Sequence, residues 1–286
     1  MGYEVYALKR NPFPHHGAFP LEDPDEEVYA FAIPPRSEIR KKLDARLASL
    51  REGEGSALLF LLGDYGSGKT HALKYMQYAA KRRFGDVASV YVKSLGRASI
   101  LALYREIIAG LESELGREFL LNLMAEAVSR LPPVGWPDLR RAFLHAASGD
   151  PAALRWVYGL EISDAERRRL NLIFDVGEKA PEAISTLVTL LWRLRGMKLL
   201  VLVDEFEGAV ERSTVEEMRS FYGGLRDLID RMPEGSLMVF AMTYTAFADM
   251  RKGLRALNPA LDDRMWSGWD LVNLKGMEVD EMVEML

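Results

Sequence analysis

The 286-residue sequence contains no cysteine. Disulfides, iron–sulfur clusters, thiolate zinc sites and cysteine nucleophiles are therefore excluded. Histidine is scarce as well: the four histidines form no HExxH pattern, which argues against a zinc hydrolase. With 49% hydrophobic and 28% charged residues, the composition is that of an ordinary globular protein, which excludes collagen-like and disordered classes.

Long apolar stretches are also missing. Even the longest uninterrupted apolar runs, such as Ala57–Leu62, are short, whereas a membrane-spanning helix needs about 20 such residues. The N-terminus lacks the charged-then-apolar layout of a signal peptide, and Tyr6 stands where a myristoylation signal needs Ser or Thr. These absences predict a cytoplasmic protein without a membrane partner.

The sequence has no excess of basic residues. Its 42 acidic and 37 basic side chains give a net charge of −5. A domain that binds DNA over a broad surface usually carries a basic excess. Any contact with DNA is therefore expected to be local or supplied by a partner.

The chain divides into an arm and one α/β domain. Residues 1–35 are rich in proline and aromatic residues, which predicts an extended arm. Residues 36–51 carry apolar residues at helical spacing. Apolar runs without clean alternation then predict strands buried on both faces of a parallel sheet, in a three-layer α/β domain over residues 36–275. The five runs are Ala57–Leu62, Val87–Val92, Leu199–Val203, Leu237–Met242 and Leu271–Leu274.

About 106 residues separate the second and third predicted strands. A plain crossover connection needs far fewer, so we expect a helical insertion over residues 98–196. Ser163 followed by Glu166 predicts a capping box, and Pro151 and Pro181 suit the first turns of helices. The six helices predicted there are 99–114, 118–131, 137–147, 151–158, 163–170 and 181–194.

The strongest functional pattern is GxxxxGK[ST], the P-loop, which follows the strand ending at Leu62 and opens a helix over residues 69–84. Its residues are Gly63, Asp64, Tyr65, Gly66, Ser67, Gly68, Lys69 and Thr70, with His71 next to it. Backbone N–H groups of such a loop surround phosphate groups. Lys69 is predicted to reach the β- and γ-phosphates of a nucleotide, and Thr70 to hold Mg²⁺.

A second pattern is the apolar strand that ends in Asp204 and Glu205, which matches a Walker B element. Successive strand residues face opposite sides, so the two carboxylates can have different roles. Asp204 is predicted to fix the Mg²⁺ shell, and Glu205 to orient and deprotonate the attacking water. The alternative is that Glu205 is merely solvated.

Two further residues are candidates for catalysis. Thr243, at the end of its strand, could bond the γ-phosphate or the lytic water; alternatively it caps the next turn, and Tyr244 and Thr245 compete for the role. Arg264, just before the last strand, could reach the γ-phosphate of a neighbouring subunit. Alternatively, Arg264 pairs with the acidic residues beside it.

Taken in this order, the motifs resemble those of the AAA+ ATPases, over about residues 30–275, and within them the initiator-type (origin-recognition-like) clade. The resemblance implies that the fourth strand lies between the first and the third. It also implies that the segment before the first helix packs on adenine, which nominates Ile33, Pro34 and Arg36.

A narrower resemblance is to the P-loop ATP-binding proteins of BREX-type phage-defence systems. It covers the P-loop with His71, the stretch 203–207, residues 222–230 before the strand ending at Thr243, and residues 154–161 of the insertion. Together the resemblances imply an ATPase that binds ATP, ADP and Mg²⁺, forms homo-oligomers, and couples nucleotide state to a protein partner in DNA processing or genome defence.

The sequence departs from the AAA+ pattern after the last predicted strand. Residues 276–286 predict only the start of a lid helix, without a sensor arginine or a winged helix. A nucleotide-dependent scaffold that binds ATP with negligible hydrolysis, and docks a partner through the insertion, is therefore an alternative. A small-molecule kinase is a third interpretation, but no residues for an acceptor pocket or lid are identifiable.

Overall fold

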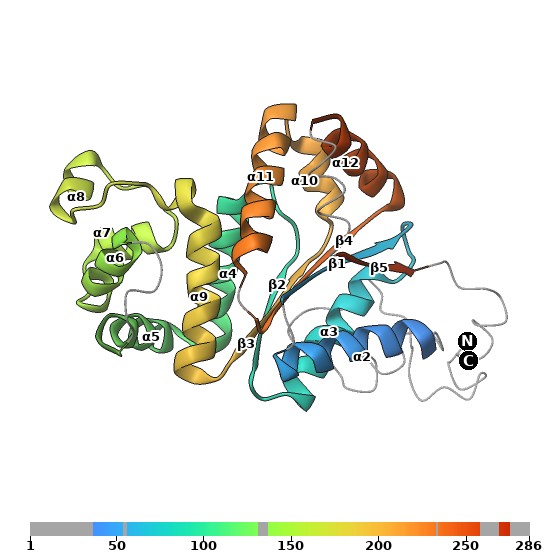
Figure 1. Cartoon of the computed structure of the whole chain (residues 1–286), viewed down its shortest axis with the longest axis horizontal. Helices are drawn as coiled ribbons and strands as arrows, with labels where there is room; N and C mark the ends of the chain where they lie inside the picture. The colour runs from blue at the N-terminus through green and yellow to red at the C-terminus, as the bar shows by residue number, and fades with distance from the viewer. Residues whose placement is uncertain (1–36, 54–55, 131–136, 233, 258–268, 275–286) are drawn as a thin grey trace, which may run out of the picture.

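The computed structural model describes residues 37–53, 56–130, 137–232, 234–257 and 269–274, in which strands and helices alternate (Figure 1). The predicted arm, residues 1–35, and the predicted lid start, residues 276–286, lie outside these ranges. Within the described ranges, no helix is long and apolar enough to cross a membrane.

Five parallel strands form one sheet in the order β2-β3-β4-β1-β5. They are β1 Ser56–Gly63, β2 Val87–Val92, β3 Lys198–Val203, β4 Ser236–Met242 and β5 Trp269–Leu274. All five predicted strands are confirmed, with ends within two residues of the expected ones. β4 lies between β1 and β3: Leu59 is opposite Val239, and Val201 is opposite Met238. The predicted order of neighbours is therefore confirmed.

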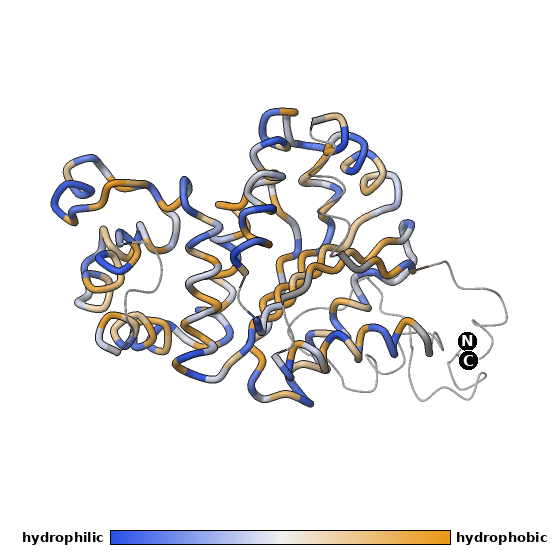
Figure 2. The backbone as a smooth tube through the Cα atoms, in the orientation of Figure 1, coloured by the Kyte–Doolittle hydropathy of each residue, from blue (hydrophilic) through white to orange (hydrophobic). Residues whose placement is uncertain are grey.

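Both faces of the sheet are buried. Along β1, Leu58, Phe60 and Leu62 belong to one hydrophobic cluster, whereas Leu59 and Leu61 belong to the other. This division follows from the two-residue period of a strand, in which neighbours point to opposite faces. The strands accordingly form an apolar centre in Figure 2. Burial on both sides explains why the apolar runs do not alternate with polar residues.

Helices cover the two faces, which makes three layers (Figure 1). One face packs against α2 Ser37–Glu52 and α3 Lys69–Arg83. Both helices were predicted, within one residue at each end. The other face packs against α4 Ile100–Leu115, α9 Ala180–Arg195, α10 Phe206–Arg212, α11 Val215–Arg231 and α12 Tyr244–Leu257.

The described residues between β2 and β3 are helical, as predicted. Between α4 and α9 lie α5 Arg117–Arg130, α6 Pro137–Ala147, α7 Pro151–Val157, α8 Asp164–Arg169 and the 3₁₀ helix η2 Val176–Lys179. α4 packs on β2 and α9 on β3, whereas α5 to α8 lie farther from the sheet (Figure 1). Tyr104 of α4 and Trp156 of α7 are fully buried in the hydrophobic cluster that includes the strands. The insertion thus shares its core with the sheet.

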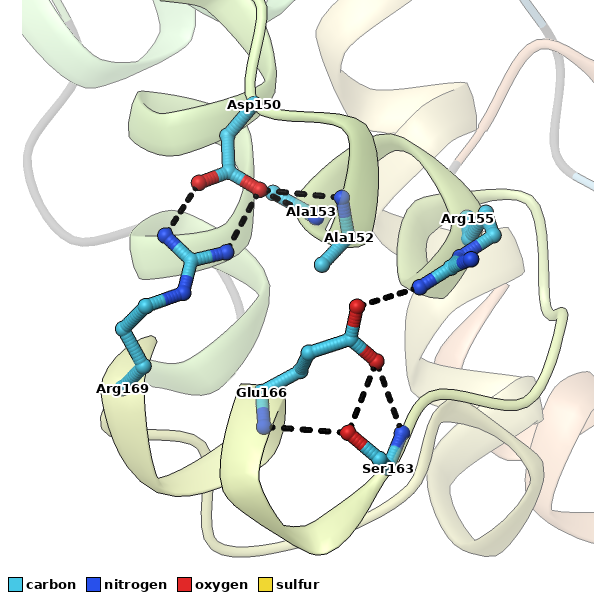
Figure 3. A network of polar contacts seen from close by, with 7 residues as sticks. All are labelled: Asp150, Ala152, Ala153, Arg155, Ser163, Glu166 and Arg169. Carbon is cyan, nitrogen blue, oxygen red and sulfur yellow. Dashed lines mark hydrogen bonds and ion pairs between the residues drawn. The ribbon is translucent and has the colours of Figure 1, made fainter.

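Polar contacts fix the ends of the short helices in the insertion (Figure 3). Ser163 and Glu166 form the predicted capping box at the start of α8. Asp150 precedes α7, and its Oδ1 accepts hydrogen bonds from the N–H groups of Ala152 and Ala153 at 2.9 and 3.1 Å. Arg169 donates to both carboxylate oxygens of Asp150, and this holds the pKa of that carboxyl well below its usual range.

Candidate functional site

The P-loop joins β1 to α3 at the carboxyl edge of the sheet. Gly68 precedes the helix with φ 91°, a left-handed conformation that glycine adopts without steric cost. No side chain caps the first turn of α3, so its N–H groups have no capping acceptor. Lys69 is buried, and its Nζ donates hydrogen bonds to the carbonyl oxygens of Gly63 at 2.8 Å and Asp64 at 3.1 Å. These two bonds hold the lysine ammonium against the backbone of the loop.

Thr70 and Asp204 are 134 positions apart in the chain and meet at this edge of the sheet. Thr70 Oγ1 donates a 2.7 Å hydrogen bond to Asp204 Oδ2. The backbone of Asp204 is fixed as well, because its N–H donates to the carbonyl oxygen of Val92 at 2.8 Å. Its Oδ1 accepts from the N–H of Glu205 at 2.9 Å. The structure thus brings together the two residues predicted to hold a metal.

A cavity of about 520 Å³ opens between the P-loop and α10. Its lining contains eight of the predicted site residues: Tyr65, Gly66, Gly68, Lys69, Thr70, His71, Asp204 and Glu205. Four lining residues were not predicted, namely Glu207, Gly208, Glu211 and Arg212. Gly63, Asp64 and Ser67 belong to the loop but do not line the cavity. The helix α10 therefore forms a second wall that sequence reasoning missed.

Glu205 occupies a strained position at the turn from β3 into α10. Its backbone has φ 46° and ψ 38°, which is uncommon for a residue with a side chain. This conformation ends the strand and starts the helix within one residue, and it leaves the Glu205 side chain exposed at the cavity. Non-glycine residues held in this region often belong to functional sites.

Glu207 is a buried carboxyl group in the cavity wall. Its Oε2 has no hydrogen-bond partner among the described residues. Burial raises the pKa of Glu207, and the positive charge of Lys69 acts in the opposite direction. On the facing wall, burial lowers the pKa of His71, so its imidazole is neutral at pH 7.

Of the other predicted residues, only Thr243 lies within the described ranges. Thr243 directly follows β4 and is buried, and its Oγ1 accepts a hydrogen bond from the N–H of Ala246 at 3.3 Å in the first turn of α12. It does not line the cavity, and its catalytic role remains a prediction. Ile33, Pro34, Arg36 and Arg264 lie outside the described residues.

The donor set at Thr70 and Asp204 suits one kind of metal. The described residues contain no group of three or more His, Asp or Glu side chains that could hold an ion. Mg²⁺ is commonly bound by one or two protein oxygens together with waters and phosphate oxygens. A hydroxyl and a carboxylate in contact, beside a phosphate-binding loop, fit that ion.

Part of the sequence matches a known protein family. Residues 24–118 match the family described as BREX system ATP-binding protein BrxC/D. This span contains β1, the P-loop, α3, β2 and α4, and it confirms the resemblance drawn from the sequence. A search of curated proteins gives no match.

Solved structures of ORC proteins from Aeropyrum pernix also match. The ADP form of ORC2 is 15% identical over 88% of this chain, with a TM-score of 0.46. ORC2 in ADPNP–ADP complexes is 17% identical over 89%, also with a TM-score of 0.46. ORC1 in complex with DNA is 18% identical over 91%, with a TM-score of 0.41. The chain spans about half the length of these structures, 52%, 52% and 50% respectively.

Proposed function

We propose that this protein is an AAA+-type module that binds MgATP and hydrolyses it to ADP and phosphate. The observation that carries the proposal is the contact of Thr70 with Asp204, next to Lys69 in the lining of the cavity. These three residues come from two motifs far apart in the sequence. Their convergence at the carboxyl edge of a parallel sheet is the arrangement in which α/β proteins bind nucleotides.

Each residue has a separate role in this proposal. Lys69 leaves its two carbonyl acceptors to neutralise the β- and γ-phosphates, and the N–H groups of the P-loop bind their oxygens. Thr70 and Asp204 hold Mg²⁺, which on binding neutralises charge on the phosphates. Glu205 orients the attacking water and accepts its proton.

The charge of the cavity wall makes this binding depend on the metal. Four carboxyl groups line the cavity, from Asp204, Glu205, Glu207 and Glu211, against two cations, Lys69 and Arg212. A triphosphate entering alone meets this excess of negative charge. We therefore expect ATP to bind much more weakly in EDTA than in Mg²⁺.

Further predicted residues, of which Thr243 alone lies within the described ranges, complete the proposal. Ile33, Pro34 and Arg36 pack on adenine, and Arg264 reaches the γ-phosphate of a neighbouring copy, so that hydrolysis follows assembly into a homo-oligomer. Thr243 contacts the γ-phosphate or the water. The nucleotide state then controls a protein partner in DNA processing or phage defence, and contact with DNA is local or made by that partner.

The test is ATP hydrolysis measured against protein concentration, with and without duplex DNA. We expect the rate per subunit to rise with concentration, and Glu205→Gln to abolish it while ATP still binds. Lys69→Ala is expected to lose ATP affinity, whereas Lys81→Ala, on the same helix but at the surface and paired with Glu114, should behave as wild type. Unchanged MgATP affinity in Lys69→Ala would refute the site.

A second candidate is a nucleotide-dependent scaffold with negligible hydrolysis. The observation that favours it is a set of exposed apolar side chains on the outer part of the insertion: Leu144, Leu160 and Ile173 are 51%, 50% and 68% exposed. Such side chains are suited to docking a partner protein. Tight ATP binding with turnover at background at every protein concentration would favour the scaffold over the hydrolase.

A further inference from the structure

Asp204 receives a second side-chain hydrogen bond that none of the motifs predicts. Tyr91 of β2 donates from its hydroxyl to Asp204 Oδ2 at 2.8 Å. The same oxygen accepts the bond from Thr70. β2 is the strand next to β3, and Tyr91 is opposite Leu202, two residues before Asp204 and on the same face of the sheet. The register of the two strands thus places the phenol beside the carboxylate.

A buried lysine lies against the ring of this tyrosine. Lys74 follows Thr70 by one turn of α3, and it is only 5% exposed. Its Nζ lies 3.2 Å from the centroid of the Tyr91 ring and has no hydrogen-bond acceptor among the described residues. Burial lowers the pKa of Lys74 to about 8, and the negative charge of Asp204 acts in the opposite direction. At pH 7 the lysine is therefore mostly a cation.

Such an ammonium needs compensation, because a buried charge without a partner is costly. The face of the Tyr91 ring attracts a cation, and this attraction is strongest where water is excluded. A cation over the ring also draws electron density from the phenol, which makes its O–H a better donor. The contact therefore fixes the ring and strengthens its hydrogen bond to Asp204.

We propose that Tyr91 and Lys74 are positioning residues for the metal-binding carboxylate: Lys74 acts on Tyr91, and Tyr91 orients Asp204. The inference rests on the proposed function, in which Thr70 and Asp204 hold Mg²⁺. Outer partners of metal ligands commonly contribute about 10–100-fold to metal affinity or activity. A loss of that size is expected when the phenol hydroxyl is removed.

Charge and position predict opposite results for Lys74. Removing a cation near a metal site should, by Coulomb's law alone, strengthen Mg²⁺ binding. Removing a residue that positions Asp204 should weaken it. Lys74→Met removes the charge and keeps nearly the length of the side chain. Tighter Mg²⁺ binding in this variant would indicate a purely Coulombic effect, and weaker Mg²⁺ binding would indicate a positioning role.

The experiment titrates Mg²⁺ into the full chain with a fluorescent ATP analogue, and also measures the analogue's affinity in EDTA. Tyr91→Phe is expected to raise the Mg²⁺ concentration at half-saturation by about 10-fold or more, with the affinity in EDTA unchanged. Lys74→Met should shift it in the same direction, and the double variant should match Tyr91→Phe within about 2-fold, because Lys74 acts through Tyr91.

Two matched controls exist. Tyr75 lies next to Lys74 on α3 and is buried. Its hydroxyl donates a 2.6 Å hydrogen bond to Asp44 Oδ1, and neither residue lines the cavity. Tyr75→Phe therefore removes a similar hydrogen bond without touching Asp204. Lys81→Met removes a surface lysine of the same helix. Neither control should change the dependence on Mg²⁺.

Several results would overturn the proposal. They are an unchanged Mg²⁺ titration in Tyr91→Phe, a tighter one in Lys74→Met, or an equal shift in Tyr75→Phe, which would indicate a general structural effect. Failure of the proposed function is distinguishable: wild-type protein would then bind no analogue, or bind it equally well in Mg²⁺ and in EDTA, and this inference would fall with it.

Discussion

Gly63, the first residue of the P-loop, lies where a side chain has no room. A Cβ built there would overlap the hydroxyl oxygen of Ser67 and come within 2.8 Å of the carbonyl oxygen of Leu274. The first neighbour belongs to the loop itself, and the second is the backbone at the end of β5. The Ser67 hydroxyl can rotate away, but the Ser67 Cβ, at 3.0 Å, and the Leu274 carbonyl move only with the P-loop and with an edge strand of the sheet. We therefore predict that Gly63→Ala strains both.

Overpacking of this kind costs about 1–3 kcal/mol. For the 286 residues of the chain, the entropy of unfolding is about 0.6 kcal/mol/K, so each kcal/mol lowers the melting temperature by about 2 °C. Gly63→Ala should thus melt about 2–6 °C below wild type in calorimetry. Gly85→Ala is the matched control, because a Cβ at Gly85 meets nothing within 4 Å.

A double variant identifies the source of the strain. The Ser67 hydroxyl oxygen is buried without a hydrogen-bond partner, so Ser67→Ala alone should change stability little. In the Gly63→Ala background, Ser67→Ala removes the contact with the Ser67 hydroxyl. It should therefore restore about 1 kcal/mol of the free energy of unfolding, a coupling expected of residues in contact. If Gly63→Ala melts no lower than Gly85→Ala, or if Ser67→Ala restores nothing, the packing argument is wrong.

Two predictions concern pH. Because burial raises the pKa of Glu207 in the folded state, the contribution of this carboxyl group to the free energy of unfolding should fall as pH rises above its unfolded pKa of about 4.3. Glu207→Gln should remove that loss, so the free energy of unfolding in urea should exceed that of wild type by an amount that grows from pH 4 to pH 8. Glu216→Gln, at an exposed position, is the control. For Asp150, the folded pKa is lowered, so its stabilising contribution is present above about pH 3.9 and is lost below it. Asp150→Ala should lower the free energy of unfolding by about 1 kcal/mol at pH 7, and by less at pH 3. Asp150→Asn keeps a side-chain acceptor for the helix cap, so its loss at pH 7 should be smaller than that of Asp150→Ala. Equal losses for the two variants would contradict the capping role.

Most of the fold could be predicted because its signals are local. Apolar runs indicated the strands, and capping residues and prolines indicated the helices of the insertion. The P-loop and the pair Asp204–Glu205 were identifiable for the same reason, since each lies within a few consecutive residues. Thr70 and Asp204 were each predicted to hold Mg²⁺, and the structure places them in contact.

The rest of the site depends on contacts between distant segments. The helix α10 has seven residues and begins after a left-handed Glu205, so it lacks the length and the cap that identify helices in a sequence. Glu207, Gly208, Glu211 and Arg212 were missed with it. Lys74 gave no signal either, because a helical lysine is usually solvated; only the packing of α3 on β2 brings it to Tyr91. For Thr243 the sequence left two roles open, and the structure contains the contact expected of a helix cap.

The order of the strands explains how a large insertion can coexist with this site. β4 separates β1 from β3, so the P-loop and Asp204 approach each other across the end of β4, above the sheet rather than within it. The insertion enters after β2 and returns into β3, and its helices α4 and α9 pack on those two strands. The helices α5 to α8 are therefore separated from Thr70, Lys69 and Asp204 by the layer that α4 and α9 form on the sheet. Packed contacts lead from these helices to the cavity by three routes: through α4 to β2, through α9 to β3 and Asp204, and through α9 and α11 to α10, where Phe221 packs against Phe206.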